Sequence, residues 1–170
     1  MSDAPTTLAA RVAKNRVSGG DAPSPLAPNL YLAFLATAGR LGDDTALRDP
    51  ARGAELSWSQ LRERSAAVAG GLSRLGVGRA DTVALLHSNR HELYVCDLGA
   101  VAIGAVPFSV YPTYSAEQIA HLLADAGARV AIAEEAFLER LAAARPLMPA
   151  LEKVIVMDGA GGDMTLAELE

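Results

Sequence analysis

The histidines and acids that follow the first long apolar run are candidates for chemistry by residue type. His87, His91 and Glu92 stand in the order HSNRHE, which differs from the HExxH spacing that places two zinc ligands on one helix. His87 ends a predicted strand and His91 begins a helix, so we interpret both as structural and predict no metal site. The acids Glu134 and Glu135 fit a helix start, where the macrodipole favours negative charge.

Two loops are candidates for holding a ligand. The glycine-rich stretch GAGG, residues 159–162, follows a predicted strand but lacks the lysine and hydroxyl residues of a phosphate loop. The loop after the second predicted strand places two tyrosines and a threonine beside a rigid proline, which could grip an adenine ring or an acyl chain. A structural turn is the alternative. With polar residues at the preceding strand end, the candidate binding residues are Tyr111, Pro112, Thr113, Tyr114, His87 and Asn89.

Two further residues lie in an unusually apolar stretch, residues 93–106. Cys96 is the single cysteine, which excludes an internal disulfide framework, and we interpret it as a small core residue. Asp97 is more unusual, because a buried carboxylate needs partners. We expect Arg90 or a neighbouring backbone group to supply them. No catalytic constellation is recognisable in the sequence.

Apolar runs of strand length alternate with helical patterns, which predicts an α/β fold with a parallel sheet and flanking helices, Rossmann-like or flavodoxin-like. Right-handed crossovers favour the strand order 2-1-3-4, with a topological switch between the first and third strands. A helix from Asn29 and a short hairpin around the turn DPARG precede the sheet. The four predicted strands are Thr82–Leu86, Val106–Ser109, Val130–Ala133 and Lys153–Met157.

Helix starts are marked by capping boxes, in which a serine or threonine and a glutamine or glutamate satisfy each other's backbone amides. The boxes are SWSQ from Ser57, SAEQ from Ser115 and TLAE from Thr165; Asn89 has similar cap spacing. Gly99 is costly inside a helix, and we expect close approach to the sheet to compensate. The last box opens a helix at the end of the chain, which predicts a longer parent protein.

Composition narrows the possible partners. The chain has 170 residues, of which 51% are hydrophobic and 21% charged, with a net charge of −5. This balance argues against nucleic acid as the main partner. The longest apolar run falls short of the roughly 20 residues of a membrane span. We predict a cytoplasmic protein, with peripheral membrane attachment of the parent left open, a flexible tail at 1–28 and an incomplete α/β subdomain at 29–170.

The ordered pattern of residues 56–134, which includes YPTYSAEQI, and the later phrase KVIVMDG resemble the N-terminal region of adenylate-forming acyl-CoA ligases. Within that superfamily the sequence looks most like the long-chain fatty-acid–CoA ligases. The resemblance implies a parent acid–thiol ligase that uses ATP, Mg²⁺ and CoA to convert a fatty acid through an acyl-adenylate to a thioester. In some relatives the segment matching residues 107–113 lies near the CoA channel.

No catalytic residue of the family can be assigned to a position in this sequence. The family's phosphate loop, its nucleotide-binding motifs and the catalytic lysine of its C-terminal lid have no counterpart in these 170 residues. The segment alone is therefore predicted to be inactive and to require no cofactor. The alternative is a truncated, non-catalytic relative that binds an acyl or nucleotide ligand or pairs with a partner. A flavodoxin-like regulatory domain is a third interpretation, weakened by the lack of a carboxylate cluster after the first strand. An exposed sheet edge predicts self-association.

Overall fold

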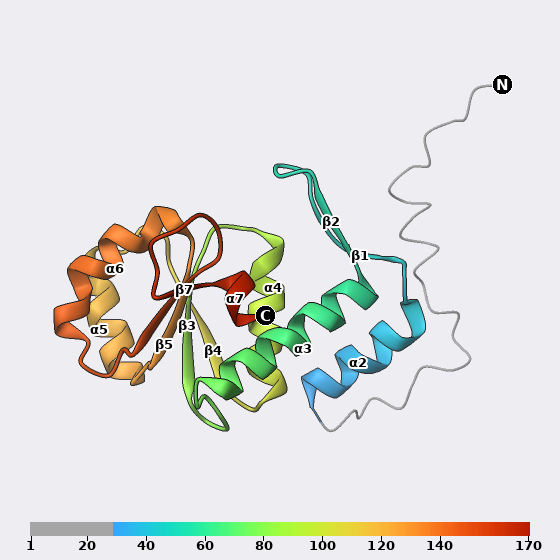
Figure 1. The fold of residues 1–170 in the computed structure, drawn as a ribbon, viewed down its shortest axis with the longest axis horizontal. Helices are drawn as coiled ribbons and strands as arrows, with labels where there is room; N and C mark the ends of the chain where they lie inside the picture. The colour runs from blue at the N-terminus through green and yellow to red at the C-terminus, as the bar shows by residue number, and fades with distance from the viewer. Residues whose placement is uncertain (1–28) are drawn as a thin grey trace.

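A computed structural model describes residues 29–170 (Figure 1). The predicted tail at 1–28 lies outside the described residues. Helix α2 (Leu30–Leu41), a hairpin of β1 (Thr45–Asp49) and β2 (Ala54–Ser57), and the long helix α3 (Trp58–Arg74) come first. The strands of the main sheet are β3 (Thr82–Leu86), β4 (Val106–Val110), β5 (Val130–Ala133), β6 (Lys153–Val156) and β7 (Met164–Thr165). The remaining helices are α4 (His91–Ala102), α5 (Ala116–Ala126), α6 (Leu138–Ala144), α7 (Leu166–Leu169) and the 3₁₀ turns η1 (Glu135–Phe137) and η2 (Arg145–Leu147).

The main sheet has the order β4-β3-β5-β6-β7, and every neighbouring pair is parallel. This confirms the predicted fold class and the predicted order of the four strands. The hairpin is also confirmed. Strand β7 was not predicted, because two residues after a glycine-rich turn carry no periodicity. The helix predicted from Glu134 is wrong in its first turn, which is the 3₁₀ segment η1.

Alternate residues of β3 supply two separate apolar cores. Val83 and Leu85 pack with buried residues of α3 and α4, whereas Ala84 and Leu86 pack with those of α5 and α6. Figure 1 shows these helix pairs on opposite sides of the sheet. Burial on both faces explains the continuous apolar runs of the inner strands. The sheet is therefore the middle layer of the fold, and the loops that connect its strands to the helices lie at its two ends.

Helix α4 lies within the first core. Cys96 is fully buried there, and burial raises the pKa of its thiol, which confirms it as a core residue. Among residues 29–170, no helix combines the length and hydropathy that a bilayer crossing requires. The apolar character of α4 is accounted for by its packing between the sheet and α3.

The three predicted capping boxes are present at the starts of α3, α5 and α7. The prediction for Gly99 was wrong about the partner. A Cβ at this position would lie 2.6 Å from Cγ1 of Val68 and 3.0 Å from the backbone oxygen of Ser65, both on α3. Gly99 therefore permits close contact between two helices, not between a helix and the sheet.

The C-terminal helix α7 is docked on α3 through another glycine. A Cβ at Gly71 would overlap the carbonyl oxygen of Leu169 and lie 2.6 Å from its Cγ. Arg74 Nη2 donates to the same carbonyl at 2.8 Å, and Arg64 Nη2 pairs with the Glu170 carboxylate at 2.7 Å. A helix of one turn has little stability of its own, so these contacts hold it in place.

We predict that Gly71→Ala lowers the free energy of unfolding by about 1–3 kcal/mol, the usual cost of overpacking. Gly70→Ala is the matched control, because its Cβ would have ordinary contact, 3.6 Å from Nη1 of Arg74. The control should gain up to about 1 kcal/mol of helix propensity. Urea unfolding of the whole chain measures both, and equal effects would contradict the described docking of α7.

Candidate functional site

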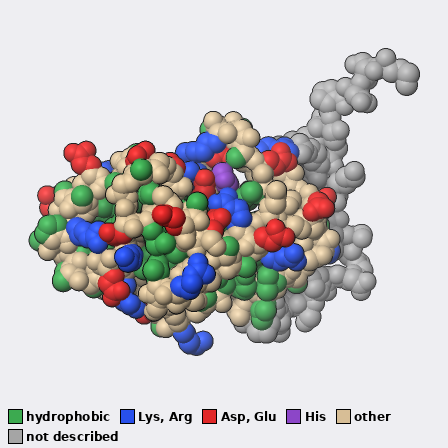
Figure 2. Space-filling view, viewed as in Figure 1, with side chains coloured by type: hydrophobic (Ala, Val, Ile, Leu, Met, Phe, Trp, Pro, Cys, Tyr) green, Lys and Arg blue, Asp and Glu red, His purple; other side chains and the backbone are tan. Residues whose placement is uncertain are grey.

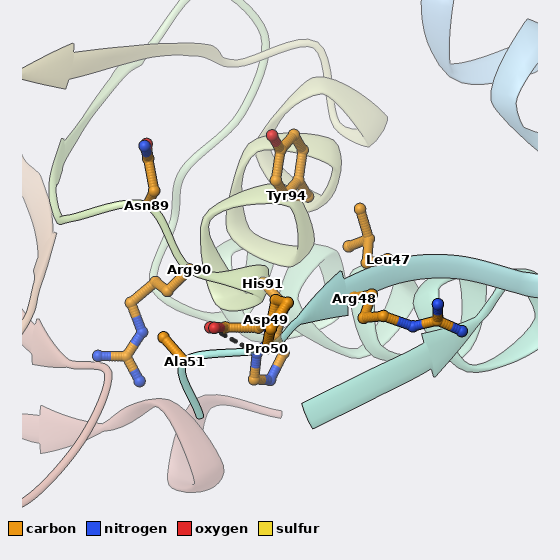
Figure 3. Close-up of a pocket in the computed structure, with 9 residues that line it drawn as sticks. All are labelled: Leu47, Arg48, Asp49, Pro50, Ala51, Asn89, Arg90, His91 and Tyr94. Atoms are coloured by element: carbon orange, nitrogen blue, oxygen red, sulfur yellow. Dashed lines mark ion pairs between the residues drawn. The ribbon is translucent and has the colours of Figure 1, made fainter. Parts of the chain in front are cut away.

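The carboxyl ends of β3, β4, β5 and β6 meet at one edge of the sheet, where small ligands bind in open α/β folds. Two hollows open there, and Asn89 lines both. The first, of about 300 Å³, lies between the ends of β3 and β4. The second, of about 370 Å³, lies between the β1–β2 hairpin and the start of α4 (Figure 3).

The hollow between β3 and β4, called here the β3–β4 hollow, contains four of the six predicted binding residues. Thr113 is exposed and outside its lining, and Tyr114 supports it indirectly, with ring centroids 5.5 Å from Tyr111. The sequence-based prediction missed Ser109, whose side chain reaches His87. The lining residues are His87, Ser88, Asn89, Ser109, Val110, Tyr111 and Pro112.

The loop that forms one wall of this hollow is held by α6. Nη1 of Arg140 donates to the carbonyl oxygens of Pro112 at 2.6 Å and Tyr114 at 2.8 Å. Its guanidinium lies 4.9 Å from the ring centroid of Phe137, within cation–π range. No sequence pattern links residues 26 or 28 positions apart in this way. The wall is therefore a fixed surface and not a free loop.

Arg90, not Asn89, is the N-cap of α4, and in the described part of the chain it makes no side-chain capping bond. The prediction of Asn89 as the cap was wrong, because it is the Arg90 backbone that has the extended conformation of an N-cap. The Arg90 side chain instead binds carboxylates at the edge of the sheet. That side chain is 4% exposed. Its Nε and Nη2 each donate to Glu92 at 2.8 Å, and Nη1 donates to Asp158 at 2.6 Å. Nη1 also lies 3.4 Å from Glu134, so the expected pairing with Asp97 is replaced by three other acids.

The expected ligand position at the switch between β3 and β5 is filled by the protein's own polar groups. The Ser88 N–H donates to the Glu134 carboxylate, which Arg90 also approaches. From the hairpin turn, Arg52 donates to the Ser88 hydroxyl at 3.2 Å and to the Asn89 carbonyl oxygen at 3.3 Å. These bonds tie hairpin, β3 and β5 together, and the open space lies on either side of them.

Figure 3 shows the second hollow between the hairpin and the first turns of α4, with Leu47 and Tyr94 at one end and Asp49 and His91 at the other. Nδ1 of His91 lies 3.3 Å from Glu92 Oε2 and 3.9 Å from Asp49 Oδ2. Within residues 29–170, this buried nitrogen has no hydrogen-bond partner. His87 and His91 thus line different hollows.

The glycine-rich turn after β6 holds a carboxylate of its own chain. The N–H of Ala160 donates to Glu135 Oε1 at 3.2 Å, and the N–H of Glu135 donates to Asp158 Oδ1 at 2.8 Å. A Cβ at Gly159 would overlap the Glu135 carboxyl group. Gly159 has a φ of +68°, and this conformation and the close packing on Glu135 both require glycine. The glycine at this position is thus explained by contacts within the chain.

Acidic side chains near the two hollows are paired with Arg90, and this pairing affects the pKa values of two of them. Burial would raise the pKa of Glu92, but hydrogen bonds from Arg90 outweigh it and hold the pKa below its ordinary value. Burial likewise opposes the fall in the pKa of Asp158, which the Glu135 N–H and Arg90 bring about. Figure 2 shows basic and acidic side chains interspersed over the visible face, without a large patch of one sign.

Comparison with known proteins places these features in a family. The sequence model of the family described as AMP-binding enzyme matches residues 34–169, so the chain belongs to the AMP-binding enzyme family. The uncharacterized protein Rv1549 of Mycobacterium tuberculosis (strain H37Rv) is 40% identical over 128 residues, 75% of this chain and 71% of that protein. The long-chain-fatty-acid–CoA ligase FadD15 of Mycobacterium bovis is 32% identical over 108 residues.

The match to FadD15 covers 63% of this chain and 18% of the ligase. The inhibitor-bound N-terminal domain of FACL13 from Mycobacterium tuberculosis shares the fold, with a TM-score of 0.76, 24% identity, and coverage of 83% of this chain and 35% of that chain. The chain thus spans a minor part of the ligases it matches. The predicted resemblance to the N-terminal region of acyl-CoA ligases is confirmed.

We predict that Arg90→Met lowers the free energy of unfolding by about 3 kcal/mol, because it leaves carboxylates at the sheet edge without their cation. This value is at the low end for a buried ion pair, since Asp158 is 43% exposed and partly screened by water. Arg48→Met is the control, because the Arg48–Glu55 pair lies at the surface and such pairs contribute little. Urea denaturation measures both, and equal losses would contradict a central role for Arg90.

The same ion pairs predict how stability depends on pH. Glu92 and Asp158 have folded-state pKa values below their ordinary values of 4.5 and 3.8. Their contribution is therefore complete above the ordinary values and is lost as the pH falls through the folded-state values. The free energy of unfolding should decrease below pH 4.5, more steeply in the wild type than in Arg90→Met. Parallel curves from urea unfolding at several pH values would refute this assignment.

Proposed function

We propose that this chain is the N-terminal part of an ATP-dependent fatty-acid–CoA ligase, and that by itself it does not activate fatty acids. The observation that carries the proposal is the family match over residues 34–169, combined with coverage of 18% of FadD15. The parent reaction would join a fatty acid to AMP with release of pyrophosphate, and then transfer the acyl group to the thiol of CoA. ATP, Mg²⁺, CoA and the fatty acid are thus partners of the parent, which we place in the cytoplasm.

The residues of this segment support the proposed inactivity. Adenylyl transfer depends on cations and backbone donors that stabilise charge on the phosphates. The chain contains two lysines, Lys14 and Lys153. Lys153 begins β6, at the end of the strand opposite the two hollows. Two arginines of residues 29–170 line the hollow between the hairpin and α4, and both are paired: Arg90 with Glu92 and Asp158, and Arg48 with Glu55. This pairing supports the proposed lack of a cation for nucleotide phosphates there.

The β3–β4 hollow has a supporting role in this proposal. Its wall of Tyr111 and Pro112, with Thr113 and Tyr114 behind, would border the channel through which acyl group and CoA pass. His87 and Asn89 would supply polar contacts from the end of β3. The fixed position of this wall under Arg140 supports such a role, because a preformed surface loses little entropy on binding.

The alternative is a truncated, non-catalytic module that binds an acyl or nucleotide ligand or pairs with a partner ligase. The observation that favours it is Rv1549, a relative of comparable length, since 128 aligned residues make up 71% of that protein and 75% of this chain. Calorimetric titration with palmitoyl-CoA separates the alternatives, because the module should bind it without any other part of a ligase.

Self-association through the exposed edge of the sheet is part of the same proposal, and the edge strand β4 limits how strongly another chain could pair with it. Val106 on the edge strand β4 is 51% exposed. Its N–H donates to the Asp81 carbonyl oxygen, so the N–H groups at positions 107 and 109 point away from β3. Position 107 is Pro107, which has no N–H to donate. Pairing through this edge would therefore use fewer backbone bonds than an ordinary free strand offers.

We predict that the purified chain shows no ATP–pyrophosphate exchange with palmitate and Mg²⁺ above a blank without protein. A complete long-chain fatty-acid–CoA ligase, assayed in parallel, shows that the conditions permit the reaction. Exchange by the chain itself would refute the proposed inactivity. Circular dichroism on the same sample ensures that a negative result comes from a folded protein.

A further inference from the structure

A serine and a histidine from different strands meet in the β3–β4 hollow. Ser109 lies near the end of the edge strand β4 and is exposed, whereas His87 follows β3 and is 9% exposed. The Ser109 hydroxyl oxygen lies 3.3 Å from Nε2 of His87. An accessible hydroxyl in front of a buried imidazole is the arrangement that serine nucleophiles require.

The second ring nitrogen fixes the tautomer of His87. Nδ1 lies 2.9 Å from the carbonyl oxygen of Ser88, which can accept a hydrogen bond but cannot donate one. Nδ1 therefore carries the proton in the neutral ring, and Nε2 presents its lone pair to the Ser109 hydroxyl. The imidazole is thus oriented as a general base, with a backbone carbonyl in the position of the acid of a catalytic triad.

The residues around His87 would stabilise the positive charge that forms when the imidazole accepts a proton. Asp97 on α4 is half-buried; burial raises the pKa of its carboxyl group, and His87 lies near enough to act in the opposite direction. A protonated His87 would therefore be attracted to the ionised Asp97. Tyr111 and Pro112 form an apolar wall of the hollow, whose volume of about 300 Å³ fits a small acyl group.

We propose that Ser109 and His87 form a nucleophile–base pair that hydrolyses small activated esters or thioesters. The Ser109 hydroxyl proton moves to Nε2 of His87 as Oγ bonds to the acyl carbon. The carbon–oxygen or carbon–sulfur bond to the leaving group then breaks, and His87 returns the proton to the leaving alkoxide or thiolate. Water, activated in turn by His87, cleaves the acyl-serine to the free acid and restores Ser109. Asn89 lines the same hollow and offers an amide donor to the oxyanion.

The proposal is independent of adenylation, because it needs no nucleotide or metal ion, and it is tested with the full chain. The probe is p-nitrophenyl butyrate, whose hydrolysis releases a coloured phenolate. We expect the wild type to exceed an equal concentration of free imidazole by about 100-fold, the lower range for a positioned general base. Ser109→Ala should lose this excess, while Ser73→Ala, an exposed serine on α3, should retain it.

Two further measurements separate a catalytic pair from a structural contact. A fluorophosphonate should add one covalent group to the wild type, located on Ser109 by peptide mass spectrometry, and none at that site in Ser109→Ala. His87→Gln should lose both the excess rate and the labelling of Ser109, because the base that activates the hydroxyl is removed. The proposal is overturned if Ser109→Ala retains the rate, if the wild type matches imidazole, or if a folded His87→Gln keeps the wild-type rate and labelling.

Discussion

The buried guanidinium of Arg90 is the interaction on which the arrangement of this sheet edge depends. One side chain, 4% exposed, joins Glu92 on α4, Glu134 after β5 and Asp158 after β6. Arg52 extends the network to the hairpin through Asp49 and the Ser88 hydroxyl. Buried charges are tolerated when each has a close partner of opposite sign. The network therefore fixes the relative positions of elements that share little apolar contact at this edge.

The position of this network decides where a ligand can lie. In doubly wound sheets the crevice at the switch point is usually open, because adjacent crossovers leave in opposite directions. Here Glu134 closes that crevice by accepting from the Ser88 N–H and by pairing with Arg90. The free space is displaced to the neighbouring gap between β3 and β4. His87 and Tyr111 line the hollow in that gap.

The sequence predicts this fold well wherever the information is local. The strand order followed from apolar runs such as Thr82–Leu86 and from the handedness of crossovers, and the capping boxes at Ser57, Ser115 and Thr165 located three helix starts. Predictions failed where a side chain forms ion pairs or hydrogen bonds with residues far away in the sequence. Asn89 is a residue type that often caps helices, yet the N-cap of α4 is Arg90, whose guanidinium is held by three acids.

The candidate site was predictable in part for the same reason. His87, Asn89, Tyr111 and Pro112 follow strands that must end at one edge, so topology brings them together. Ser109 and Arg140 could not be found in this way. Ser109 is 22 positions from His87, and their contact depends on the register that pairs Leu85 with Ser109. Arg140 reaches Pro112 across the interface of α5 and α6, which no periodicity encodes.

The proposed channel and the proposed nucleophile make opposite demands on the same hollow. A ligase must deliver its thioester intact, whereas an exposed hydroxyl in front of an oriented imidazole would hydrolyse a thioester that paused beside it. The 3.3 Å separation of Ser109 and His87 is long for a hydroxyl hydrogen bond, so a small shift of β4 would uncouple the pair. Among residues 29–170, β4 pairs with another strand on one side alone, so fewer backbone hydrogen bonds oppose such a shift than in the inner strands.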